Sequence, residues 1–188
     1  MPETFDAWMR ILNRVPGSVL WLIEDNDEVK SNLQREAAAR GIDGERLIFS
    51  GRVPPADHLA RHRCADLFLD TLPYNAHTTA SDALWVGLPV LTCIGNTFPG
   101  RVAASLLGNI GLSDLITSTL DEYEQLAIAL STHPPQLAEL RKKLAVNRDA
   151  TPLYDTQLYT KHLELAFSAM HQRRQSGLRP KHISISNL

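Results

Sequence analysis

The sequence predicts an α/β fold in which helices cover both faces of a parallel sheet and the C-terminal part is helical. Short apolar runs alternate with helical patterns from residue 1 to 117, which is typical of parallel strands joined by helices. Several of these runs are continuously apolar, as expected of strands buried on both faces. With 188 residues, the chain can form one domain with a full core. We therefore expect a Rossmann-like region over residues 1–117.

Apolar spacing and breaker residues place the elements of this region. Residues 4–14 carry apolar side chains at helical spacing and end before Pro16-Gly17, which predicts an amphipathic helix. Strands are expected at residues 18–23, 47–49, 67–70 and 90–93, with a weak fifth at 115–116. Helices are expected at residues 27–40, 55–64, 78–87 and 100–108.

The remainder of the chain predicts helices packed on the same domain over residues 118–175, followed by a tail over 176–188. Thr119 is a candidate cap for a helix over 120–131, and the pair Pro134-Pro135 begins another that runs to about 147. Asp155 caps a long third helix. Its apolar stripe is predicted to lie in the core and consists of Tyr159, Leu163, Phe167 and Met170.

Composition indicates a metal-free cytoplasmic protein. The net charge of −2 and the pI near 6.4 give no electrostatic reason to expect nucleic acid or an anionic membrane as partner. No apolar run approaches the roughly 18 residues of a membrane helix. Cys64 and Cys93 are isolated, which predicts small core residues in a reducing compartment. Neither Cys nor His shows the spacing of metal ligands.

The stretch from Asp70 to Pro89 carries the strongest functional signal. His77, Thr78 and Thr79 are predicted at a helix N-terminus directly after a strand, where free N–H groups and the helix dipole favour a phosphate. Asp82 lies one turn further along the helix, and a carboxylate there suits a sugar diol. These residues together predict a nucleotide site. The alternative is that Thr78 or Thr79 is an ordinary N-cap and His77 a loop residue.

Two further loops are expected at the same rim, because ligands of parallel α/β sheets bind at the carboxyl ends of the strands. One loop, at residues 51–57, precedes His58 and Arg61. The other, at residues 94–100, precedes Arg101. The usual dinucleotide and Walker-type glycine fingerprints are absent from the sequence.

Several motifs, taken in order, resemble the protein O-linked N-acetylglucosamine transferase family. They are Leu12-Asn-Arg-Val-Pro-Gly-Ser-Val-Leu-Trp-Leu22, Arg46-Leu-Ile-Phe-Ser50, Asn75-Ala-His-Thr-Thr79, Asp82-Ala-Leu-Trp85, Gly87-Leu-Pro89 and Arg101-Val-Ala-Ala-Ser105. The resemblance covers residues 4 to 175. It implies the C-terminal, donor-binding lobe of a GT-B glycosyltransferase, in which residues 1–117 bind the nucleotide sugar.

That family transfers sugar from UDP-N-acetylglucosamine to Ser or Thr of proteins without a metal or other cofactor, and its members carry TPR repeats before a two-lobed catalytic unit. By resemblance, His77, Thr78 and Thr79 hold the diphosphate and Asp82 the ribose. The N-terminal lobe and the TPR repeats are therefore expected partners, together with the UDP-sugar donor and the protein acceptor.

The resemblance also places His58 and Arg61 beside the uracil. Without the resemblance, both would be read as exposed charges on an amphipathic helix. Arg101 either approaches the sugar-phosphate rim or makes contacts only within its own lobe. The residues expected to bind the nucleotide sugar are His58, Arg61, His77, Thr78, Thr79, Asp82 and Arg101.

One departure from the family leaves the donor open. Where the family often has Ala-Pro-Lys before the position of His58, this chain has Pro54-Pro55-Ala56. Pro54 has no N–H to donate to a base edge, and Ala56 has no charge for a phosphate. The alternatives are a lobe that serves another donor or acceptor, such as GDP-fucose, a lipid or a polysaccharide, and a non-catalytic interaction module.

A second departure concerns catalysis and stability. The family places a strand and a functional lysine just before the helix that begins here near Pro2, and a catalytic histidine in the N-terminal lobe. We therefore expect no catalytic residue in this chain and no transfer by the chain alone. Strands 18–23 and 67–70 would lack a shared neighbour, so the chain should be marginally stable, self-associate, or shift its strands to close the gap.

Overall fold

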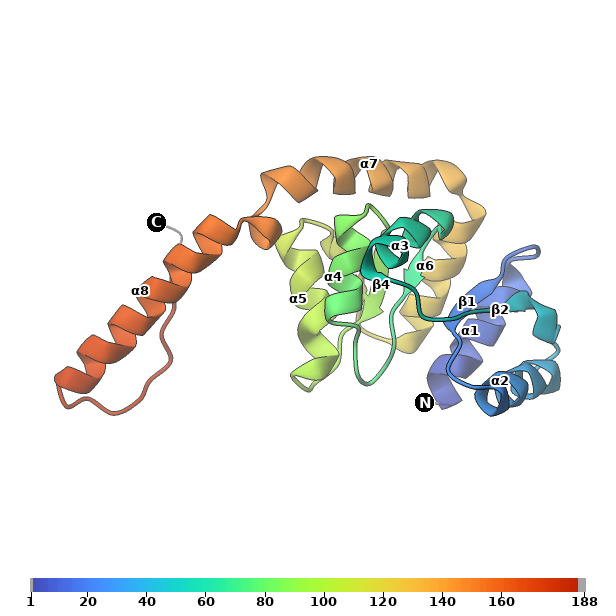
Figure 1. Cartoon of the computed structure of the whole chain (residues 1–188), viewed down its shortest axis with the longest axis horizontal. Helices are drawn as coiled ribbons and strands as arrows, with labels where there is room; N and C mark the ends of the chain where they lie inside the picture. The colour runs from blue at the N-terminus through green and yellow to red at the C-terminus, as the bar shows by residue number, and fades with distance from the viewer. Residues whose placement is uncertain (1, 186–188) are drawn as a thin grey trace.

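The computed structural model describes residues 2–185 and confirms the α/β class (Figure 1). The strands are β1 (Leu20–Ile23), β2 (Leu47–Ser50), β3 (Phe68–Leu69), β4 (Val90–Cys93) and β5 (Ile116–Thr117). The helices are α1 (Pro2–Arg14), α2 (Asp27–Ala39), α3 (Pro55–Arg61), α4 (Thr78–Trp85), α5 (Val102–Asn109), α6 (Leu120–Thr132), α7 (Pro134–Ala150) and α8 (Thr156–Gln175). Each predicted helix is present, although α7 extends to Ala150 rather than ending at about 147.

Side-chain caps begin several helices where the sequence predicts them. The Asn26 Oδ1 accepts the Val29 N–H at 2.8 Å at the start of α2, and Thr119 forms a capping box with Glu122 at the start of α6. The Asp155 Oδ1 accepts the N–H of Leu158 at 2.8 Å and starts α8. Such caps satisfy N–H groups that have no partner within the helix, so local chemistry fixes these boundaries.

The strands form two separate parallel sheets. β1 pairs with β2, and β4 lies between β3 and β5. Within residues 2–185, no strand joins β1 to β3. This arrangement agrees with the expectation that these two strands lack a shared neighbour, and they have not moved together to close the gap.

Helices cover both faces of β4, as the sequence predicts. Val90 packs in a core cluster with residues of α4 and α5, whereas Leu91 and Cys93 pack in another with residues of α1 and α6. Successive side chains of a strand point to opposite faces, so β4 is buried throughout. The central strand is therefore packed on both faces beneath the loops that follow β3 and β4.

Helix α1 connects the two sheets. Its Met9 and Leu12 pack with Leu20 of β1 and Leu47 of β2, while its Ile11 contributes to the core around β4. The predicted full burial of the first strand is wrong, because only Leu20 of β1 is buried, whereas Trp21 and Leu22 are half-buried and Ile23 is 51% exposed. Ile23 lies next to the open edge of the smaller sheet.

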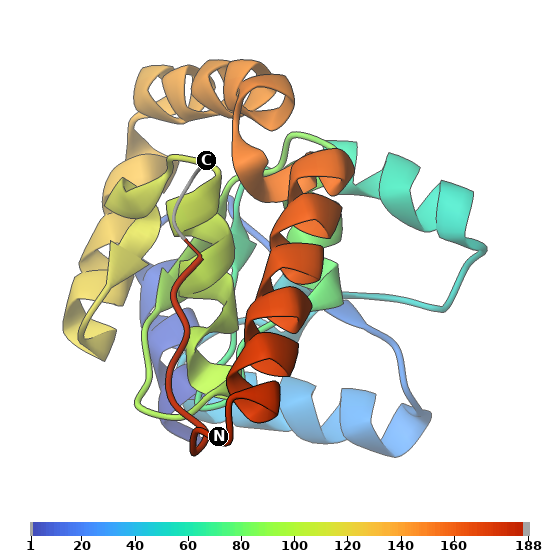
Figure 2. The same ribbon diagram turned by 90° about the vertical axis from the view of Figure 1, so that its left-hand side faces the viewer.

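Helix α8 extends away from the rest of the molecule, and the segment after it runs back along the same helix (Figures 1 and 2). The predicted burial of its apolar stripe is wrong, because the four side chains are 40–67% exposed: Tyr159, Leu163, Phe167 and Met170. The amphipathic pattern is present, but the described part of the chain leaves these four side chains exposed.

The two cysteines differ in their environment. Both are free thiols; Cys93 is buried as predicted, whereas Cys64 is exposed, so its predicted core position is wrong. Cys64 lies in the 3-10 turn His62–Cys64 that follows α3, at the molecular surface. Of the helices described, none combines the length and apolar character needed to cross a membrane.

Candidate functional site

The loops after β3 and β4 meet at the carboxyl ends of these strands, as predicted for two of the three loops. The Asn75 N–H donates to the Pro99 carbonyl at 3.1 Å, and the His77 Nε2 lies 3.3 Å from the same oxygen. Gly100 permits this approach, since a Cβ there would lie 2.9 Å from the Pro73 carbonyl oxygen. Backbone contacts therefore bring residues from two distant segments together.

The N-terminus of α4 is free of side-chain caps. The helix begins at Thr78, and its N-cap residue is His77, whose side chain makes no capping hydrogen bond. The alternative in which Thr78 or Thr79 is the N-cap is therefore wrong. Both threonines are exposed, and the first N–H groups of the helix have no partner within it. This geometry suits a phosphate group.

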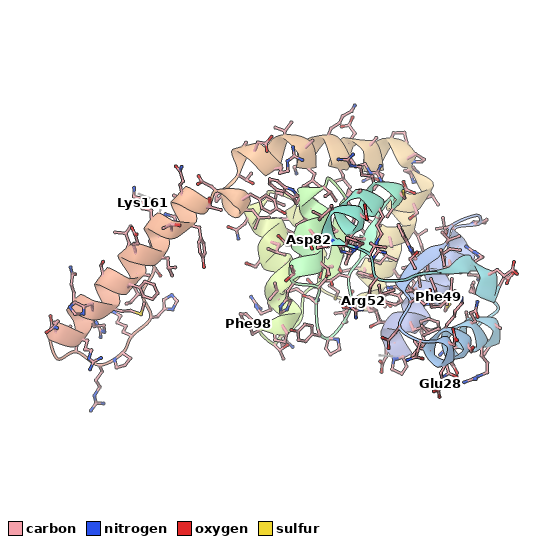
Figure 3. All side chains as sticks on the ribbon, in the orientation of Figure 1. Glu28, Phe49, Arg52, Asp82, Phe98 and Lys161 are labelled. Carbon is pink, nitrogen blue, oxygen red and sulfur yellow. The ribbon has the colours of Figure 1, made fainter. Side chains whose placement is uncertain are left out.

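Two aromatic rings hold the His77 imidazole in place. The Tyr74 ring stacks on it with centroids 4.8 Å apart, and the Phe98 ring meets it edge-on at 6.3 Å. Tyr74 is 62% exposed and Phe98 is 80% exposed, and Phe98 projects from the edge of the loop region in Figure 3. Neither ring is predicted from the sequence, because their contact with His77 depends on loops that meet only in the folded chain.

A second group of side chains lies on α3. The Arg61 Nη2 donates to the His58 Nδ1 at 2.9 Å, and its Nη1 donates to the Gly51 carbonyl at 2.9 Å. The guanidinium also lies over the Trp21 ring, 5.8 Å from its centroid. Both His58 and Arg61 are half-buried, so they are not the independent exposed charges of the alternative interpretation.

The surroundings of His58 disfavour its protonated form. Burial lowers its pKa below 6.5, and the nearby charges of His62 and Arg61 lower it further, against an opposing effect of Asp82. The hydrogen bond from Arg61 requires an unprotonated Nδ1 as acceptor. A neutral imidazole can stack on a base without repelling the adjacent guanidinium, and with Nδ1 as the acceptor of Arg61 its Nε2 carries the hydrogen and can donate a hydrogen bond.

A cavity of about 790 Å³ connects part of the candidate set. Its walls include His58 and Arg61 of α3 and Thr79 of α4. Trp21 and Thr71 also line it, and neither was identified from the sequence. The cavity continues between β1 and β3, where residues of α1 and of the turn after α3 also line it.

The other predicted residues lie outside the wall of this cavity. Asp82 is half-buried on α4 and close enough to influence the pKa of His58 (Figure 3). Arg101 is exposed at the end of the 3-10 turn Pro99–Arg101. Among residues 2–185, no group of three or more His, Cys, Asp or Glu side chains could hold a metal ion.

Comparison with known proteins identifies the family. The sequence matches glycosyl transferase family 41 over residues 1–163. The chain belongs to this family. A curated relative, the probable UDP-N-acetylglucosamine–peptide N-acetylglucosaminyltransferase SEC of Arabidopsis thaliana, is 36% identical over 185 residues, which are 98% of this chain and 19% of that protein.

Two further comparisons agree. The UDP-N-acetylglucosamine–peptide N-acetylglucosaminyltransferase of Caenorhabditis elegans is 34% identical over 97% of this chain and 16% of its own length. The solved structure of a mutant O-GlcNAc transferase from Thermobaculum terrenum superposes with a TM-score of 0.86 at 37% identity, over 90% of this chain and 33% of that one. This family-41 chain therefore spans less than one fifth of the length of these curated relatives.

Proposed function

We propose that this chain is the donor-binding lobe of a protein O-glycosyltransferase that transfers N-acetylglucosamine from UDP-N-acetylglucosamine to Ser or Thr of proteins. The observation that carries the proposal is the uncapped start of α4, which follows β3 and contributes Thr79 to the same cavity as His58 and Arg61. The relatives named as transferases of this kind support the choice of reaction.

The diphosphate would bind at the start of α4. There the N–H groups and hydroxyls of Thr78 and Thr79 are hydrogen-bond donors, and the positive end of the helix dipole faces an anion. The His77 imidazole, fixed by stacking on Tyr74, lies beside them. These groups would stabilise the charge that develops on the UDP leaving group as the glycosidic bond breaks.

The nucleoside would extend from this position toward α3. Asp82 lies one turn inside α4, where its carboxylate can accept hydrogen bonds from a ribose diol. Neutral His58 offers an aromatic face to a base, and Arg61 keeps that ring oriented through its 2.9 Å hydrogen bond. Arg101 would contact the donor at the exposed outer rim.

We also propose that transfer needs no metal, because helix dipole, hydroxyls and cationic side chains together neutralise the diphosphate. In the full-length protein, activity should persist in EDTA. Loss of activity on chelation, with recovery in Mg²⁺ or Mn²⁺, would contradict this part of the proposal.

The choice of UDP over GDP is tested separately. Pro54, the N-cap residue of α3, has no N–H to donate to a base edge, and Ala56 in the first turn carries no charge for a phosphate. The unfolding temperature of this chain should rise by more with UDP than with GDP at equal concentration. A shift with GDP alone would support the GDP-fucose alternative, whereas no shift with any nucleotide would support a non-catalytic interaction module.

Catalysis itself would require the N-terminal lobe and TPR repeats of a longer protein, and the acceptor would be a Ser or Thr side chain of another protein. The open edges of β1 and β3 support a related proposal, that this chain by itself self-associates. Unpaired strand edges readily accept a further strand. Because catalysis would require those further parts of a longer protein, this chain by itself should bind the nucleotide without transferring sugar to a peptide.

A further inference from the structure

Asp70 is a fully buried carboxylate at the carboxyl end of β3. Its N–H donates to the Leu91 carbonyl at 3.0 Å, which continues the pairing of β3 with β4. Its Oδ2 accepts the Thr92 hydroxyl of β4 at 2.6 Å. Its Oδ1 accepts two backbone N–H groups, from Thr71 at 2.8 Å and from Ala76 at 2.6 Å.

These two N–H groups lie at opposite ends of the loop between β3 and α4. Thr71 opens the loop, and Ala76 immediately precedes His77, the N-cap residue of α4. One carboxylate oxygen therefore closes the loop and fixes the start of the helix. Inside the loop, the Thr71 hydroxyl donates to the Tyr74 carbonyl at 2.7 Å, and the Asn75 Nδ2 donates to the Thr71 carbonyl at 3.0 Å.

The backbone carbonyl of Asp70 is also held by side chains of α6 and α1. The Tyr123 hydroxyl of α6 donates to the Asp70 carbonyl at 3.0 Å, and it accepts the Trp8 indole N–H of α1 at 3.2 Å. Tyr123 is fully buried. Helices α1 and α6 thus anchor the point from which the loop leaves the sheet.

The chemistry of Asp70 excludes direct contact with a phosphate. An ionised carboxylate only accepts hydrogen bonds, and here its oxygens already face three donors in the interior. Burial raises the pKa of the carboxyl, and the hydrogen bonds from Ala76, Thr92 and Thr71 oppose that shift. Its influence on an anionic ligand must therefore pass through the loop that it holds.

We propose that Asp70 is a positioning residue for nucleotide binding: it ties Thr71 and Ala76 to the end of β3, so that the uncapped start of α4 is held ready for the diphosphate. The inference rests on the proposed function, since it concerns the same anion site. It adds a residue that makes no contact with the ligand but sets the geometry of the groups that do.

The test uses the 188-residue chain with UDP as the probe. In the Asp70→Ala variant both loop amides lose their acceptor, and UDP affinity measured by calorimetry should fall roughly tenfold or more. The Asp70→Asn variant should recover most of this loss. Its amide oxygen can accept both N–H groups, while its NH₂ donates to the Thr92 hydroxyl, which can rotate to accept.

Thr92→Val is the matched control. It removes the Oδ2 contact in the same buried cluster but leaves both loop amides bound to Oδ1. It should lower the thermal unfolding temperature yet keep UDP affinity within about twofold of the original chain. Amide hydrogen exchange at Ala76 should accelerate in Asp70→Ala and remain slow in Thr92→Val and Asp70→Asn.

Three results would overturn the positioning role: unchanged UDP affinity in Asp70→Ala, an equal loss in Thr92→Val, or no recovery in Asp70→Asn. If Asp70→Ala does not fold, Asp70→Ser replaces it, because its hydroxyl is too short to reach the Ala76 N–H; the same loss is expected and its absence is equally decisive. Failure of the unaltered chain to bind UDP would instead refute the proposed function, and with it the inference.

Discussion

Replacement of Gly100 by Ala should separate the two loops that form the site. A Cβ at this position would lie 2.9 Å from the Pro73 carbonyl oxygen and 3.3 Å from the Gly95 Cα. Both neighbours are backbone atoms, so neither can turn aside as a flexible side chain would. Overpacking of this kind typically costs about 1–3 kcal/mol. We therefore expect Gly100→Ala to lower the free energy of unfolding by about that amount.

The assay is thermal unfolding, in which each kcal/mol corresponds to roughly 2–4 °C for a chain of this size. Gly108→Ala in α5 is the matched control, because a Cβ there meets nothing within 4 Å. Alanine is favoured over glycine inside a helix by about 1 kcal/mol, so this variant should be slightly more stable. UDP affinity should fall in Gly100→Ala and stay unchanged in Gly108→Ala. A Gly100→Ala variant as stable as the control would refute the close approach of the loops.

Three further predictions address the site and the open sheet edges. Thr79→Ala and Asp82→Ala should each weaken UDP binding in calorimetry by roughly 0.5–3 kcal/mol, the contribution of one hydrogen bond; unchanged affinity in both would contradict the site. The pKa of His58 is lowered below 6.5 in the folded chain. Just below pH 6.5 the unfolded chain therefore binds more protons at this residue than the folded chain does, and the free energy of unfolding decreases as the pH falls. His58→Gln should lose less stability than the original chain on acidification from about pH 7 to 5, and equal losses would contradict the neutral state. In sedimentation velocity the 188-residue chain should self-associate through β1 and β3, and a stable monomer at high concentration would count against open edges.

Much of the fold follows from local chemistry, which the sequence displays directly. The capping box of Thr119 and the cap of Asp155 need only residues a few positions away. Gly87 adopts a positive φ of 90° just after α4, a conformation that glycine tolerates without strain. This glycine therefore marks the end of the helix in the sequence. Such signals predict where elements begin and end.

The remaining features depend on contacts between distant segments. The apolar stripe of α8 has the periodicity of a core helix, but periodicity does not say whether a partner is present, and here Phe167 is 58% exposed. Likewise, the stacking of Tyr74 on His77 and the burial of Asp70 arise only when the loops after β3 and β4 come together. From the sequence, Asp70 is recognisable only as the end of a strand and the first residue of the stretch that carries the functional signal.

Calorimetric titration of this chain with UDP in the presence of EDTA tests the central claim most directly. The proposed donor-binding lobe should bind one UDP per chain without a metal, with affinity that depends on Thr79 and Asp82, and should bind GDP more weakly. Two results would contradict the assignment of the nucleotide site to the start of α4. One is the absence of binding by any nucleotide. The other is a UDP affinity in both the Thr79→Ala and Asp82→Ala variants that equals that of the unaltered chain.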